Sequence, residues 1–203
     1  MIDLATLSRG FRKSYLDHAA LTAQLQAWAT AYPAFVAVRS IGQTRERREI
    51  WMLVVGSEPD AVRPAVWVDG NMHAAEVAGS SVALAIAETI IALHVEHAGG
   101  AAAGVSLPPH LKRAVRESLF YVVPRISPDG AEQILRTGRY VRSVPRDERT
   151  AQGASRWVAD DLDGDGRKLL MRKEDPTGDF VEHPEAPGVM VPRDLADAGP
   201  FYK

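Results

Sequence analysis

The segment from Pro64 to Leu93 constrains the fold more than any other part of the sequence, because a strand, a polar turn and a long apolar helix follow one another within thirty residues. Residues 65–68 are apolar and predict a short buried strand, which Gly70 ends. Residues 76–93 are rich in small and aliphatic side chains and too numerous for a strand, so they predict a buried helix.

His73 and Glu76 lie three residues apart in the predicted turn between this strand and this helix. An imidazole and a carboxylate at this spacing can reach one point in space, as a metal ion requires. A histidine here can also be a hydrogen-bonded loop residue, and His-x-x-Glu occurs by chance in many sequences. The position favours the metal, because open α/β sheets bind ligands beyond the carboxyl ends of their strands. We therefore predict that His73 and Glu76 are metal ligands.

The other predicted elements complete an α/β fold. Apolar residues at helical spacing over residues 15–32 predict an amphipathic helix, which Pro33 ends. The β-rich segments 35–40 and 50–55 flank a charged turn and predict a hairpin, and the apolar run 119–123 predicts a central strand. This order of helices and strands predicts a mixed, twisted sheet with helices on both faces.

Two groups of basic side chains favour structural explanations. The four arginines between Arg39 and Arg48 predict a solvated loop. His94 and His97 are one turn apart near the end of the long helix, a spacing that could also suit a second metal site. We expect them to be cations that interact favourably with the C-terminal end of the helix dipole.

Composition excludes several functions for these 203 residues. The net charge of -2 gives no reason to expect nucleic acid or an anionic membrane as a partner. The absence of cysteine excludes disulfides and thiol chemistry, so a metal site must use His, Asp or Glu. We find no secretory signal and no apolar run that approaches the span of a membrane helix. As written, the chain is expected to be cytoplasmic, although an exported protein trimmed of its signal would look the same.

Three motifs resemble those of a known family. The segment VDGNMHAAEVAGS resembles the metal-binding segment of the zinc carboxypeptidases, the carboxypeptidase A-like or funnelin family. The hairpin residues Ile41-Gly42 and Arg48-x-Ile50 are similar to the start of the family's peptidase domains, in which a glycine usually stands at the place of Arg47. Ser127-Pro-Asp-Gly is similar to the family's Asn-Pro-Asp-Gly, and we expect Ser127 to keep a capping side chain.

The resemblance implies a zinc hydrolase that acts on the C-terminus of a peptide or protein. Zn²⁺ would be held by His73, Glu76 and a second histidine far downstream, as in the His₂Glu site of carboxypeptidase A. Arg142, twelve residues after Gly130, matches the family arginine that polarises the scissile carbonyl, and Arg139 and Arg146 compete for this assignment. Digestive members carry arginine at the position of Ala75, so their specificity does not transfer to this chain.

The last third of the sequence lacks the family's later motifs. Neither a third zinc ligand nor a general-base glutamate is identifiable, and His183 is the one downstream histidine at roughly the right distance. We therefore expect residues 1–203 to be a single peptidase-like domain, the N-terminal portion of a larger bacterial-type member. The tail also contains an acidic segment, Asp161, Asp163, Asp165 and Gly166, that fits the start of a calcium loop. Position twelve of this loop is Arg172, where a calcium loop carries a bidentate glutamate.

Three functions therefore compete. The leading hypothesis is a zinc metallocarboxypeptidase, which is a proteolytic hydrolase. The second is a zinc-dependent deacylase or amidohydrolase of the same superfamily, and the Ser-Pro-Asp-Gly segment favours the peptidase over it. The third is a non-catalytic domain that binds calcium or a partner.

Overall fold

The structure is a computed structural model that describes residues 3–101, 104–145, 161–162, 164–166 and 170–203. The chain divides into two units, residues 1–148 and residues 149–203. The expectation of a single peptidase-like domain over residues 1–203 stays a prediction, because two compact units can belong to one larger domain.

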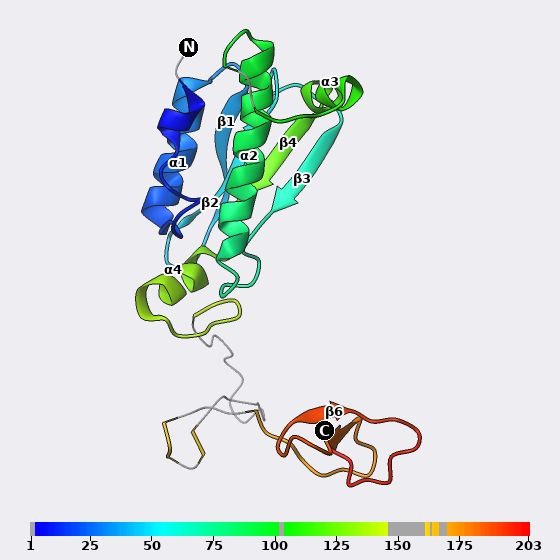
Figure 1. Cartoon of the computed structure of the whole chain (residues 1–203). Coiled ribbons are helices and arrows are strands. Elements are labelled where there is room, and N and C mark those ends of the chain that lie inside the picture. The colour runs from blue at the N-terminus through cyan, green and yellow to red at the C-terminus, as the bar shows by residue number, and fades with distance from the viewer. Residues whose placement is uncertain (1–2, 102–103, 146–160, 163, 167–169) are drawn as a thin grey trace. The chain divides into compact units, whose positions relative to one another are not determined.

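A four-stranded mixed sheet forms the framework of the first unit, with the strand order β1-β2-β4-β3 (Figure 1). Strand β2 pairs antiparallel with both β1 and β4, whereas β3 pairs parallel with β4. The α/β class and the mixed sheet predicted from the sequence are confirmed. The strands are β1 (Val36–Gln43), β2 (Glu49–Val55), β3 (Ala65–Asp69) and β4 (Leu119–Val123).

The helices of the first unit are η1 (Leu4–Leu7), α1 (His18–Ala31), α2 (Ala78–His97), α3 (Pro109–Glu117) and α4 (Pro128–Thr137). Helix α1 begins where the Asp17 side chain accepts a hydrogen bond from Ala20 N, and it ends before Pro33. Helix α4 was not predicted from the sequence. Pro128 at its first position is a helix-start signal that could have revealed it.

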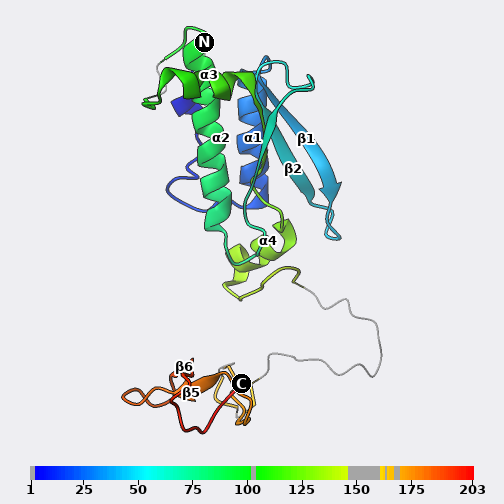
Figure 2. The same ribbon diagram turned by 90° about the vertical axis from the view of Figure 1, so that its right-hand side faces the viewer.

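Helices α1 and α2 pack side by side on the same face of the sheet (Figure 2). The core between them and the sheet contains the fully buried side chains of Trp28, Leu84 and Leu53. On the opposite face, Trp67 of β3 is 53% exposed.

Helix α2 corrects one expectation from the sequence. Its 20 residues are long and apolar enough to cross a membrane by length and composition alone. The core helix of a soluble protein passes the same test, and Leu84, Ile91 and Val95 of α2 are buried in the core. The helix is therefore explained by packing against the sheet.

A small antiparallel hairpin organises the second unit, formed by β5 (Phe180–Glu182) and β6 (Met190–Pro192). Tyr202 extends it by bridging to Phe180. The guanidinium of Arg172 lies 5.0 Å from the ring centroid of Tyr202, and that of Arg193 lies 4.5 Å from that of Phe201.

Candidate metal centre

The turn between β3 and α2 is folded tightly against the first turn of α2. A Cβ atom on Gly70 would lie 2.4 Å from Gly79 O, and a Cβ atom on Gly79 would lie 2.8 Å from Asn71 N. No side chain fits at these separations, so both positions require glycine. The close approach fixes the turn relative to the strand and the helix.

Asn71 shapes this turn and was not identified from the sequence. Its φ of 54° lies in the left-handed region, which asparagine tolerates better than most residues. Its buried side chain donates from Nδ2 to His73 O at 2.9 Å and to Ala74 O at 3.1 Å. An Asn directly after a Gly in a turn was the available signal.

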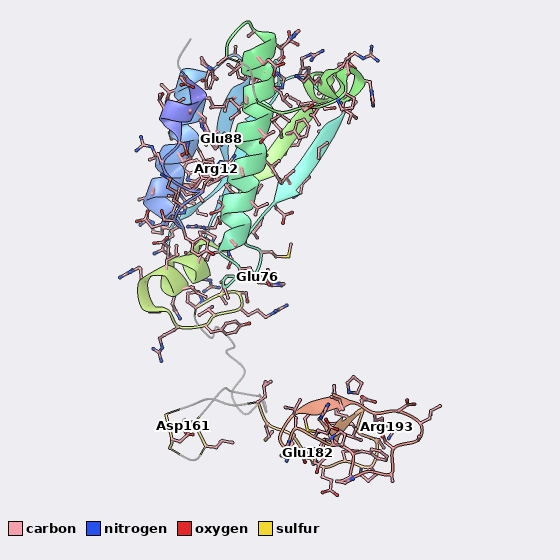
Figure 3. The ribbon with its side chains drawn as sticks, in the orientation of Figure 1. Arg12, Glu76, Glu88, Asp161, Glu182 and Arg193 are labelled. Atoms are coloured by element: carbon pink, nitrogen blue, oxygen red, sulfur yellow. The ribbon has the colours of Figure 1, made fainter. Side chains whose placement is uncertain are left out.

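The structure brings the two predicted metal ligands together at this turn. His73 Nδ1 lies 2.9 Å from Glu76 Oε1, and Figure 3 shows Glu76 beside the N-terminal end of α2. The His73 side chain is 35% exposed and the Glu76 side chain 64% exposed, so solvent and ions reach both groups. Metal binding itself stays a prediction.

Arg142 is the predicted arginine that reaches this pair. Its Nη2 lies 3.0 Å from His73 Nε2. A guanidinium can only donate, so Nε2 accepts, and Nδ1 carries the proton that it donates to Glu76. Of the competing candidates, Arg139 lies just after α4, where its N–H donates to Thr137 Oγ1, and Arg146 lies outside the described residues.

The nitrogen of His73 and the carboxylate of Glu76 are atoms that zinc binds. Zn²⁺ takes imidazole nitrogen and carboxylate oxygen at about 2.0–2.2 Å, so two ligand atoms 2.9 Å apart can share one ion. Within the described ranges, no third His, Cys, Asp or Glu joins them in a group that could hold a metal. The residues present thus fit two positions of a zinc site.

The other candidates for metal binding stay predictions. His183 belongs to the second unit, and its Nδ1 accepts a hydrogen bond from Glu185 N at 3.1 Å. In the acidic segment, the Asp161 carboxylate accepts hydrogen bonds from Gly164 N and Gly166 N, both at 2.8 Å. Asp163, the second predicted calcium ligand, lies outside the described residues.

The expectation of a solvated arginine loop is wrong for Arg48. Its Nη1 donates to Asp129 Oδ1 at 2.8 Å, and the Asp129 side chain is 4% exposed. Thr44 Oγ1 also donates to Asp129 Oδ1, at 2.7 Å. Burial lowers the pKa of Arg48, but hydrogen bonds to Glu46 and Asp129 outweigh it and leave the pKa raised. The hairpin tip is therefore fastened to α4.

The expectation that His94 is a cation is also wrong. The residue is 4% exposed and its ring stacks on Phe35, with the centroids 5.5 Å apart. Burial, together with the neighbouring charges of Arg63, His97 and Arg116, lowers the pKa of His94 to about 4. The ring is neutral near pH 7, whereas His97 is exposed.

Comparisons with known proteins find carboxypeptidases. A family model described as zinc carboxypeptidase matches residues 21–162. The chain is 28% identical over 119 residues to a zinc carboxypeptidase of Saccharothrix mutabilis subsp. capreolus, which covers 58% of the chain and 25% of that protein. It is 30% identical over 118 residues to carboxypeptidase B of Astacus astacus, which covers 58% of the chain and 34% of that protein.

Solved structures share the fold. Thrombin activatable fibrinolysis inhibitor matches with a TM-score of 0.59 and 16% identity, over 72% of this chain and 34% of that one. At this identity the likeness shows the fold alone. The chain spans about a quarter to a third of the length of these relatives.

Proposed function

Because the chain belongs to the zinc carboxypeptidase family, we propose that it supplies part of the active site of a zinc-dependent metallocarboxypeptidase that hydrolyses the C-terminal bond of a peptide. One observation carries the proposal. His73 Nδ1 and Glu76 Oε1 lie 2.9 Å apart beyond the carboxyl end of β3, with the Arg142 guanidinium beside them.

Each of the three side chains has a role in this proposal. His73 and Glu76 would hold Zn²⁺, which would supply an acidified water and a Lewis acid for the carbonyl of the substrate. Arg142 donates hydrogen bonds to the carbonyl oxygen of the substrate, where negative charge develops as the bond is attacked.

The hydrogen bonds of His73 predict that metal binding frees Arg142. In the structure Nδ1 carries the ring proton and Nε2 accepts from Arg142. If His73 held the metal through Nδ1, the ring would carry its proton on Nε2 instead. Two donors would then face each other, so Arg142 would leave the ring and be available to the substrate.

The substrate class follows from the family and not from this chain alone. The third zinc ligand and the general base are not assigned among the described residues, so the complete activity is part of the proposal. A small side chain, Ala75, stands between the two ligands in sequence and leaves the turn without a basic group at that position.

Zinc analysis of the purified 203-residue chain tests the metal site. We expect one bound zinc per chain, and we expect His73→Ala and Glu76→Gln each to weaken binding roughly tenfold or more, since even outer partners of metal ligands contribute that much. His97→Ala is the matched control, because His97 is an exposed histidine in the last turn of α2.

Two outcomes would contradict the proposal. Zinc affinity that survives both ligand substitutions would place the metal elsewhere. Absence of zinc together with stabilisation by calcium would favour the non-catalytic domain.

A further inference from the structure

Arg142 lies in a segment without helix or strand, so its position depends on individual contacts. Two hydrogen bonds hold the carbonyl oxygens of Arg142 and of the next residue, Ser143. Ala74 N donates to Arg142 O at 2.6 Å, and Ser127 Oγ donates to Ser143 O at 3.0 Å. The first bond comes from the metal-binding turn and the second from the Ser-Pro-Asp-Gly segment.

Ser127 is itself fixed relative to the metal-binding turn. Its N–H donates to Asn71 O at 3.2 Å, and the preceding Ile126 N donates to Gly70 O at 3.1 Å. Ser127 occupies the N-cap position of α4, but its side chain makes no capping hydrogen bond. The predicted capping role is therefore wrong, because the hydroxyl reaches across to Ser143 O.

Gly130 leaves the space that this arrangement needs. A Cβ atom there would lie 2.2 Å from Ser143 O and 2.4 Å from Ala74 Cβ. Both separations are far below contact distance, and the nearer neighbour is a backbone oxygen. Any side chain at residue 130 would therefore push the Arg142 segment away from the turn that carries His73.

We infer that Ser127 and Gly130 are positioning residues that set the Arg142 guanidinium against His73. The serine hydroxyl holds the segment and the missing Cβ of the glycine lets it approach. Their described contacts include Asn71, Ala74 and Ser143, but not His73 or Glu76. The catalytic meaning of the inference rests on the proposed function, whereas the positioning itself is a property of the metal-free chain.

Nitrogen NMR of the histidine rings in the metal-free, 203-residue chain tests the positioning. At about pH 8, above the ordinary pKa of histidine, the Nε2 signal of His73 reports whether Arg142 donates to it. We expect Arg142→Gln to shift this signal and Ser127→Ala to shift it in the same direction. Ser127→Thr keeps the hydroxyl and should restore the wild-type signal, and the exposed Ser106→Ala is the control.

Gly130→Ala provides a second variant. Its Cβ should displace the segment and shift the His73 signal as Ser127→Ala does. Far-UV circular dichroism shows whether each variant is folded. If one of Ser127→Ala and Gly130→Ala has lost the fold, the other provides the test.

The inference is overturned if folded Ser127→Ala and Gly130→Ala leave the His73 signal unchanged, or if Arg142→Gln does not shift it. A failure of the zinc measurement with the NMR shifts intact would refute the proposed function and leave the positioning correct.

Discussion

Asn71 allows a quantitative test of how the turn between β3 and α2 is built. The residue combines a left-handed φ of 54° with two side-chain donations, to His73 O and Ala74 O. Three substitutions separate these contributions. Asn71→Gly keeps the backbone freedom and removes the amide. Asn71→Ala removes both the amide and the tolerance of the left-handed backbone. Asn71→Asp keeps the shape but replaces the donor with an acceptor.

The expected losses follow from the geometry. Two hydrogen bonds at about 0.5–1.5 kcal/mol each predict that Asn71→Gly lowers the free energy of unfolding by about 2 kcal/mol. Asn71→Ala adds about 1 kcal/mol, because an alanine in the left-handed region costs roughly 1–2 kcal/mol. Asn71→Asp should be the worst, at about 4 kcal/mol or more, because a buried carboxylate then faces two carbonyl oxygens.

Urea unfolding followed by far-UV circular dichroism measures the three free energies. Zinc titration of the same variants should show affinity falling in the same order, because the turn holds both ligands. Equal stability of the glycine and alanine variants would refute the left-handed backbone at residue 71. An aspartate variant no worse than the alanine variant would refute the orientation of the amide.

Two further predictions concern the rest of the first unit. Arg47 has a φ of 61° in the hairpin turn, a conformation that glycine adopts more easily than arginine. Arg47→Gly should therefore raise the free energy of unfolding by up to about 1 kcal/mol in the same urea assay. A loss of stability would contradict the left-handed conformation at this residue. The buried His94 ring, with its pKa lowered to about 4, binds no proton between about pH 6.5 and 4, whereas the unfolded chain does. Stability should therefore fall by up to about 3 kcal/mol as the pH drops through this window, and the fall should be smaller in His94→Leu but unchanged in His97→Ala.

The strand, the turn and the long helix could be predicted because their signals are local. Apolar runs identify β3 and α2, and a spacing of three residues across a helix start brings His73 near Glu76. The ion pair between Arg48 and Asp129 joins residues 81 positions apart, and no pattern in either segment indicates the other. A sequence shows that charged side chains are present, but it does not show which of them form ion pairs with each other.

The candidate site likewise combines a local part, His73 and Glu76, with a distant part, Arg142. His73 and Glu76 depend on the close approach of Gly70 and Gly79, which is enforced by adjoining regular elements. Arg142 reaches His73 from 69 residues away on an irregular segment, and its place there depends on one serine hydroxyl, one backbone bond and the space at Gly130. Small changes around Ser127 should thus move the arginine while His73 and Glu76 stay in place. The resemblance to a family could indicate Arg142, but only the packing explains why the guanidinium of that residue reaches His73.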